Sequence, residues 1–444
     1  MTLKISISGV RGTVPDSLTP EVCLDFAKAF GSYLHDRANK TVVIGTDPRH
    51  SSEYIKGIVF SGLLATGCKV IDLGICPTPT VGLMVRELKA DGGVIITASH
   101  NPLPWNGLKF VRNDGIFLNE EQARKLIKLY ETKAFVSASP NNIISDHSGI
   151  DRHINKVMKV IKPRQAHLRV ALDCCNGAGS IATVKLLQKL GCTIVAINCN
   201  VTRPFPHPPE PVAANLKELI KAVKDYRADI GFALDSDADR LAIVSEEGKP
   251  IGEELTLALA VKYILTRHRN DPPKNKIVVT NLSTTQALDD IVRENNGTLI
   301  RTKIGEVHVA EKLKELNGLI GGEGNGGVIY PAVGFNRDSL AAIALIMDYL
   351  VTAGRSVSEL VADIPAYYMA KTKIECRQQS QVKKMIARVK AKFKKYKLIL
   401  TDGVKVLLPA GWIHVRASNT EPIIRVIAEG KSKKEVAKLI KQVV

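Results

Sequence analysis

The chain has 444 residues, of which 45% are hydrophobic, and its formal net charge at pH 7 is +18. The length favours about three domains, and the apolar fraction is typical of a globular protein with sizeable cores. No apolar run reaches the roughly 18 residues that a membrane span needs, and the first residues do not resemble a signal peptide. We therefore expect a cytoplasmic protein that does not associate with a membrane.

Short Val/Ile-rich runs alternate with amphipathic helical stretches, which predicts parallel sheets covered by helices. After residue 366 the pattern changes to strand, helix, strands, helix. In chain order, we first expect a strand at 42–44, a helix at 51–64, strands at 69–73, 92–96 and 168–172, a helix at 180–190, a strand at 193–197 and a helix at 216–223. After these we expect strands at 230–234 and 241–244, a helix at 382–393, and strands at 412–415 and 423–427.

Cysteine usage and charge distribution both favour ordinary structural roles. The eight cysteines follow no disulfide spacing, so we expect buried free thiols in a reducing compartment. Much of the positive charge lies between residues 383 and 397, where apolar residues recur at helical spacing. That pattern predicts an amphipathic helix with a solvated cationic face, and few aromatic residues stand there to stack on RNA bases.

The run Val94–Ile96 reads as a strand buried on both faces, and it is followed by Thr97-Ala98-Ser99-His100-Asn101-Pro102, which ends in a loop signal. Ser99 is thereby expected on an exposed turn at a strand end, where open α/β sheets place their chemistry. His100 follows it and Lys109 lies shortly downstream. Strand, turn, hydroxyl and nearby cation are typical of a covalent-catalysis site. The alternative is a serine turn that only closes the loop.

Three carboxylates follow the expected strand at 230–234: Asp235, Asp237 and Asp239, with Arg240 next to them. In an extended loop, carboxylates at alternate positions can converge on one hard cation, and oxygen ligands suit Mg²⁺. The spacing lacks the glycine and glutamate of a calcium-binding EF-hand loop. The alternative is a solvated acidic turn.

A glycine-rich loop at 321–327 holds one carboxylate, Glu323, and one amide, Asn325. Glycine permits close approach of a ligand, and this pair of side chains suits vicinal sugar hydroxyls. The order of residues is not that of a nucleotide-binding P-loop. The alternative is a purely structural turn.

Near the C-terminus, a polar segment between two expected strands has the composition of an anion clamp. Guanidinium, hydroxyl, amide and backbone N–H groups can surround a phosphate from several sides. The residues concerned are Arg416, Ser418, Asn419, Thr420 and Arg425. The alternative is an ordinary polar turn.

Taken in order, these four segments resemble the motifs of the α-D-phosphohexomutase superfamily, which includes phosphoglucomutase, phosphomannomutase and phosphoglucosamine mutase. Ser8-Gly9-Val10-Arg11-Gly12 is similar to the family's first element, in which the arginine faces the cleft. The chain departs from the family at three places. Ser236 stands where the metal loop usually has glycine, Asn325 where the sugar loop has serine, and Gly327 where that loop has histidine.

The resemblance implies an α/β protein with four domains around a central cleft. Three would be α/β domains with mixed, largely parallel sheets, and the fourth a smaller C-terminal α+β domain. Together with polar stretches and changes of pattern, it places the domains at 1–148 (phosphoserine loop), 149–249 (metal loop), 250–365 (sugar loop) and 366–444 (phosphate loop).

The resemblance also implies a reaction. Phosphorylated Ser99 would donate its phosphoryl group to a hexose phosphate, form a sugar 1,6-bisphosphate that also acts as activator, and recover the other phosphate. One Mg²⁺ would lie between Ser99 and the three aspartates. The acid/base candidates are Lys109 and His100, and cations such as Arg11 would favour the neutral form of Lys109. Arg240 would contact the substrate.

The motif forms look most like the archaeal-type phosphoglucosamine mutase branch, with the phosphomannomutase/phosphoglucomutase branch close to it. We expect a phosphosugar as the only partner, no nucleic acid or membrane, and a monomer or homodimer. A non-catalytic polyanion- or RNA-binding protein on the same scaffold is the alternative of another class. Retention of Ser99, of the three aspartates and of Arg416 argues against it.

Overall fold

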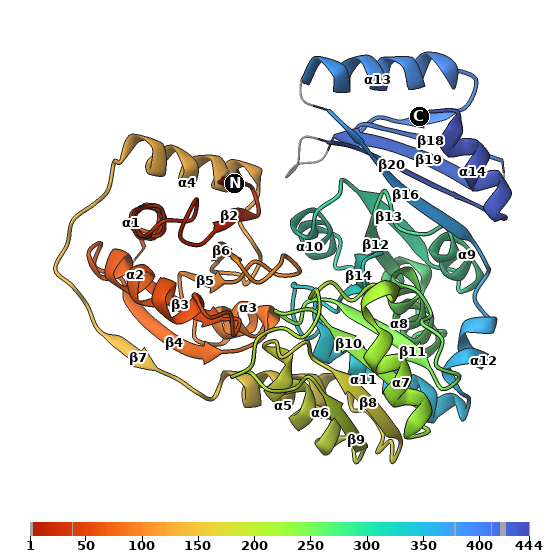
Figure 1. Cartoon of the computed structure of the whole chain (residues 1–444), viewed down its shortest axis with the longest axis horizontal. Coiled ribbons are helices and arrows are strands. Elements are labelled where there is room, and N and C mark those ends of the chain that lie inside the picture. The colour runs from red at the N-terminus through yellow and green to blue at the C-terminus, as the bar shows by residue number, and fades with distance from the viewer. Residues whose placement is uncertain (1–2, 38, 377–378, 410, 418–422, 444) are drawn as a thin grey trace.

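The computed structural model describes residues 3–37, 39–376, 379–409, 411–417 and 423–443. Their strands form four separate sheets, arranged as four lobes along the chain (Figure 1). Each sheet lies within one of the four ranges expected for the domains, whose exact boundaries stay a prediction. No helix in these ranges is long and apolar enough to cross a membrane.

The first sheet has seven strands in the order β1-β2-β6-β5-β3-β4-β7. β3, β4, β5 and β7 run parallel, and β6 turns back antiparallel to β5. The strands are β1 (Lys4–Ser6), β2 (Gly9–Thr13), β3 (Thr41–Thr46), β4 (Lys69–Ile75), β5 (Gly92–Ile96), β6 (Trp105–Arg112) and β7 (Ile143–Ser145). β7 lies within the polar stretch 133–148, where it forms an exposed strand at the edge of the sheet.

Helices cover both faces of this sheet. Val94 and Ile96 face a core built with α1 (Pro20–Tyr33), α2 (Ser52–Leu64) and α4 (Glu120–Thr132). Ile95 faces the other way, toward α3 (Thr78–Glu87), in a cluster that continues into the next two domains. Strand β5 is therefore buried on both faces, as its unbroken apolar run predicts.

The second and third sheets share one topology. Their orders are β11-β10-β8-β9 and β13-β12-β14-β15, with three parallel strands and a final antiparallel one. The strands are β8 (Arg169–Asp173), β9 (Thr193–Ile197), β10 (Ile230–Leu234), β11 (Leu241–Ser245), β12 (Ile277–Asn281), β13 (Thr298–Thr302), β14 (Ile320–Glu323) and β15 (Gly327–Ile329).

Helices pack on these two sheets, and one hydrophobic cluster joins the two domains, while Leu219 and Val223 belong to a smaller separate cluster. The helices are α5 (Gly149–Ile161), α6 (Gly179–Lys189), α7 (Lys217–Asp225), α8 (Glu253–Arg267), α9 (Ala287–Glu294), α10 (Glu306–Glu315), α11 (Ser339–Ala353) and α12 (Val357–Ala362). α11 is buried over most of its length because it packs against α5, α6 and α8 at the junction of the two domains.

The fourth sheet is wholly antiparallel, in the order β16-β20-β19-β18-β17. Val389 and Phe393, at the end of α13, are buried in its core, whereas the lysines of that helix mostly face solvent, which confirms the expected amphipathic helix. The elements are β16 (Tyr368–Glu375), α13 (Gln379–Lys392), β17 (Lys397–Ile399), β18 (Val404–Leu408), β19 (Gly411–Ala417), β20 (Ile423–Gly430) and α14 (Lys433–Lys441).

The topology explains where the motifs lie. Ser99 is in the β5–β6 connection, the aspartates in the β10–β11 connection, and Asn325 in the β14–β15 connection. In each of the first three sheets, this is the hairpin between a parallel strand and the antiparallel strand that follows it. The expected mixed α/β architecture with a smaller C-terminal α+β domain is confirmed. Six of the eight cysteines are buried, and no disulfide joins any of them in the part of the chain that the structure describes.

Candidate active site

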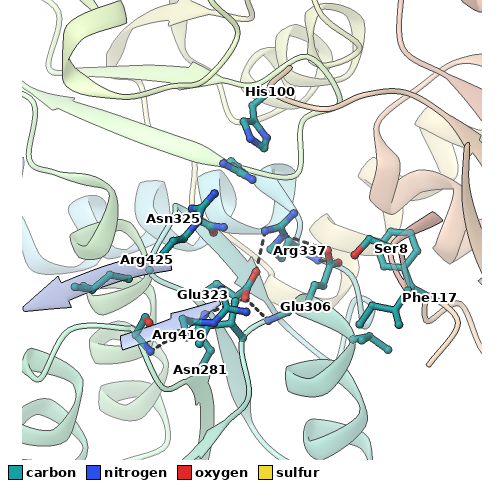
Figure 2. Close-up of a pocket in the computed structure, with 18 of the residues that line it drawn as sticks. Ser8, His100, Phe117, Asn281, Glu306, Glu323, Asn325, Arg337, Arg416 and Arg425 are labelled. Atoms are coloured by element: carbon teal, nitrogen blue, oxygen red, sulfur yellow. Dashed lines mark hydrogen bonds and ion pairs between the residues drawn. The ribbon is translucent and has the colours of Figure 1, made fainter. Parts of the chain in front are cut away.

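A cavity of about 330 Å³ is lined by residues of all four domains (Figure 2). Its lining includes charged and polar side chains of the expected motifs. They include Arg11, His100, Lys109, Arg240, Glu323, Asn325, Arg416 and Arg425. The structure therefore brings together side chains that are more than 400 residues apart in sequence.

Ser99 lies beside this cavity but is not exposed, since only 1% of its surface is accessible. The expectation of an exposed turn is therefore wrong for Ser99. Its φ is +51°, a left-handed conformation that residues other than glycine seldom adopt and that is found at functional sites. Its backbone N–H donates to Thr97 Oγ1 at 2.8 Å, and this bond helps to hold the turn.

The serine loop is stabilised by Arg49, which is 2% exposed. Its Nη2 donates to the carbonyl of Ser99 at 2.5 Å, and its Nη1 donates to those of Pro102 at 2.7 Å and Trp105 at 2.9 Å. Asp47 fixes this guanidinium through a 3.0 Å ion pair. The serine loop can be buried because the Arg49 guanidinium satisfies backbone carbonyls that would otherwise lack hydrogen-bond partners.

The three aspartates of the metal loop are buried, and one carboxylate oxygen of each lies within 4.8 Å of the others. Ser99 Oγ donates to Asp235 Oδ2 at 3.1 Å. Burial and the neighbouring carboxylates raise the pKa of Asp235 well above its usual range. Asp237 Oδ1 and Asp239 Oδ1 have no hydrogen-bond partner among the described residues.

This arrangement fits a divalent metal ion. Buried carboxylate oxygens without partners are costly, and a hard cation at this position would satisfy them and remove the repulsion between the three charges. Asp235, Asp237 and Asp239 could therefore hold Mg²⁺, and Ser99 Oγ lies close enough to Asp235 to join them as a ligand.

Lys109, on β6, lies against the same carboxylates. Its Nζ donates to Asp237 Oδ2 at 2.6 Å and is 3.6 Å from Asp239 Oδ2. Burial raises the pKa of Asp237, but the Lys109 ammonium outweighs it and holds that pKa below its usual range. Lys109 therefore forms ion pairs with two carboxylates of the metal loop, and its role in acid/base catalysis stays a prediction.

His100 and Arg240 lie between the serine and the cavity. Ser99 Oγ is 3.4 Å from His100 Nδ1. The positive charge of Arg240, together with burial, holds the pKa of His100 well below its usual range, so this imidazole is neutral. Arg240 Nε is 3.9 Å from Asp235 and 3.8 Å from Asp239, and Arg11 donates to Asn101 Oδ1 at 3.3 Å.

Glu323, the carboxylate of the expected sugar loop, is already engaged by three donors. Oε1 accepts from Asn281 Nδ2 at 2.9 Å and from the N–H of Gly305 at 3.0 Å, and Oε2 accepts from Arg337 Nη1 at 2.9 Å. A carboxylate has about four acceptor positions, so about one remains for a ligand. Contact with two sugar hydroxyls would require one of these partners to move.

At the C-terminal motif, Arg416 is 5% exposed, and its Nε donates to Asp402 at 3.1 Å. Both Arg416 and Arg425 line the cavity. Ser418, Asn419 and Thr420 lie outside the described residues. The two guanidinium groups come from neighbouring strands, where Arg416 pairs with Arg425 directly across β19 and β20.

Several cavity residues have no counterpart among those expected from the sequence. Arg337 forms ion pairs with Asp239, Glu306 and Glu323, and the half-buried Glu254 lies beside Gly324. Burial raises the pKa of both Glu254 and Glu306 to about 7. The signal that could have found Arg337 is a lone arginine in the polar run 336–338 directly before an apolar helix.

Family models cover nearly all of the chain. Models described as phosphoglucomutase/phosphomannomutase alpha/beta/alpha domains I, II and III match residues 3–137, 151–248 and 252–368, and the C-terminal domain model matches 372–444. The chain belongs to this family. It is therefore an enzyme of phosphoryl transfer, a phosphohexomutase.

Individual relatives agree with the family assignment. A phosphoglucomutase/phosphomannomutase of Thermococcus kodakarensis is 39% identical, over 96% of this chain and 94% of the relative. A probable phosphoglucosamine mutase of Methanopyrus kandleri is 36% identical, over 97% and 95%. The crystal structure of a phosphoglucomutase/phosphomannomutase family protein of Burkholderia thailandensis is similar to the present fold, with a TM-score of 0.87, 26% identity, and coverage of 98% and 96%.

Proposed function

We propose that this phosphohexomutase interconverts glucosamine 6-phosphate and glucosamine 1-phosphate, with Ser99 as the phosphoryl carrier. The observation that carries the proposal is the position of Ser99. Its Oγ is 3.1 Å from Asp235, one of three buried aspartates. Two oxygens of these aspartates have no hydrogen-bond partner among the described residues, and the neighbouring cavity is rich in cations.

In the first half of the reaction, a hydroxyl of the hexose phosphate attacks the phosphorus on Ser99. The new bond joins phosphorus to the sugar oxygen, the bond to Ser99 Oγ breaks, and the hydroxyl proton passes to a base. The candidate bases are His100, a neutral imidazole beside Ser99, and Lys109, once its ammonium has released a proton; both line the cavity. A sugar 1,6-bisphosphate results.

In the second half, the bisphosphate presents its other phosphate to Ser99. That phosphorus bonds to Oγ, its bond to the sugar oxygen breaks, and the same acid/base group returns the proton to that oxygen. Arg416 and Arg425 would hold the phosphate that is not reacting, together with Ser418, Asn419 and Thr420. Mg²⁺ on the three aspartates would neutralise charge on the transferring phosphoryl group. Arg11 and Arg240 would add positive charge at the cavity.

Two observations support an amino sugar. The Methanopyrus relative is named a probable phosphoglucosamine mutase, and the cavity is lined by three glutamates, Glu254, Glu306 and Glu323. A 2-ammonium group would find a carboxylate there, whereas a 2-hydroxyl gains less from one. The Thermococcus relative supports phosphoglucomutase or phosphomannomutase activity as the second candidate. Because O3 and O4 have the same configuration in these sugars, we expect activity on more than one of them.

The direct test compares kcat/KM for glucosamine, glucose, mannose and N-acetylglucosamine phosphates, with a sugar 1,6-bisphosphate as activator. Peptide mass spectrometry should find phosphate on Ser99 in some molecules. Ser99→Ala should lose several orders of magnitude in turnover, whereas Ser61→Ala, an exposed serine on α2, should not. Near-normal turnover of Ser99→Ala would reject the carrier, and a preference for another sugar would reject the substrate only.

A further inference from the structure

Arg337 joins two loops that the reaction would use separately. Its Nη2 is 2.6 Å from Asp239 Oδ2 in the metal loop, and its Nη1 is 2.9 Å from Glu323 Oε2 in the sugar loop. Its Nε is 3.1 Å from Glu306, and the residue is 7% exposed (Figure 2). One buried guanidinium therefore shares its charge between a carboxylate of the second domain and two of the third.

Gly327 provides the space for this side chain. A Cβ built at position 327 would lie 2.1 Å from Arg337 Cδ and 2.9 Å from its Cγ. Gly327 does not have the left-handed backbone of its neighbour Gly326, whose φ is +86°. Any residue could adopt the conformation at 327, so the steric reason for glycine there is the arginine.

We propose that Arg337 is a positioning residue that couples metal binding at the aspartates to sugar binding at Glu323, and that Gly327 admits it. The proposal rests on the proposed function, since it requires a hexose phosphate in the cavity. A guanidinium does not deprotonate in proteins, so Arg337 keeps its positive charge whichever ligand binds.

The coupling has a simple physical origin. A cation at the three aspartates would compete with Arg337 for Asp239, and the released guanidinium would then be fully available to Glu323 and the sugar. Because the two binding equilibria share this group, each ligand must change the affinity of the other by the same factor.

The test measures that factor directly, on the unphosphorylated protein, which has no phosphoryl group to transfer. Mn²⁺, which also prefers oxygen ligands, is titrated with electron paramagnetic resonance detection, with and without saturating glucosamine 6-phosphate. In the wild type we expect the sugar phosphate to tighten Mn²⁺ binding by about fivefold or more, the lower end of usual coupling between sites. In Arg337→Met this factor should fall at least about fivefold, while Mn²⁺ alone binds more tightly because a competing cation is gone.

Gly327→Ala keeps every charge and should lose the coupling in the same way, because its Cβ displaces Arg337. Gly334→Ala is the matched control, since a Cβ there meets nothing within 4 Å. The double variant Gly327→Ala/Arg337→Met should behave like Arg337→Met alone, because the clash disappears with the arginine. Arg337→Lys should restore the charge but little of the coupling, since an ammonium cannot hold both carboxylates in the same way.

Equal Mn²⁺ affinity with and without the sugar phosphate in the wild type would overturn the proposal. The proposal would also be overturned if the sugar phosphate tightened Mn²⁺ binding as much in both Gly327→Ala and Arg337→Met as in the wild type, with far-UV circular dichroism showing that both variants are folded. Failure of the proposed substrate is a separate result: glucosamine 6-phosphate would not bind, and glucose 1-phosphate would then replace it in the same titration.

Discussion

Ser236 stands where the family's metal loop has glycine, and its replacement by alanine tests whether its hydroxyl matters. Ser236 is completely buried, and its Oγ lies 2.8 Å from the carbonyl oxygen of Ser99 and 3.0 Å from Asp47 Oδ2. The hydroxyl therefore bonds the metal loop of the second domain to the serine loop of the first. Ser236→Ala removes this bond and adds no bulk.

The expected magnitude follows from what the two acceptors retain. The carbonyl of Ser99 still accepts from Arg49 at 2.5 Å, and Asp47 Oδ2 still accepts from Thr97 Oγ1 at 2.6 Å. Neither acceptor is orphaned, so the loss should lie near about 1–2 kcal/mol, between a neutral and a charge-assisted hydrogen bond. If the bond acts by holding Ser99 against Asp235, this corresponds to a fall in kcat of roughly five- to thirtyfold.

The assay is steady-state mutase kinetics with the best sugar phosphate. KM should stay within about twofold, because Ser236 does not line the cavity. Ser245→Ala is the matched control, a buried serine on β11 whose Oγ has no partner among the described residues. If Ser236→Ala and Ser245→Ala have the same kcat, the link between the two loops does not contribute to turnover and the reasoning fails.

Three other outcomes follow from the same contacts. Arg416→Ala should raise KM for 1-phosphate and 6-phosphate sugars alike by about ten- to hundredfold, the usual cost of a lost contact to a charged group; an unchanged KM for both would place the phosphate elsewhere. Gly324→Ala, whose Cβ would lie 1.9 Å from Glu254 Oε2, should raise KM for the sugar much more than Gly334→Ala does. Burial opposes protonation of His207, but its bond to Asp173 raises its pKa to about 11. The His207–Asp173 pair therefore stabilises the protein fully below about pH 6.5, and this stability is lost as the pH rises through 11. Thermal melts at pH 7 and pH 10 should therefore differ more for the wild type than for His207→Gln, and equal differences would contradict the assigned pair.

Local pattern was sufficient for the elements and for the motifs. The unbroken apolar run of β5 and its abrupt polar end placed Ser99 at a strand end, because a strand buried on both faces must be apolar and its connection must leave the sheet. The alternation of carboxylates after β10 likewise placed three oxygens within reach of one another. These features depend on residues adjacent in sequence, so one chain is enough to read them.

The partners of those residues were decided by tertiary structure. Three contacts join segments that lie from 50 to more than 100 residues apart. They are the bond from Arg49 to the carbonyl of buried Ser99, the ion pair of Lys109 with Asp237, and that of Arg337 with Asp239. Nothing in local spacing encodes which carboxylate an arginine will meet, because Coulombic and steric fit depend on how the domains pack. Gly327 is the clearest case: in the sequence it is one more glycine of a loop, and only the packed structure shows that an arginine fills the space its side chain would occupy.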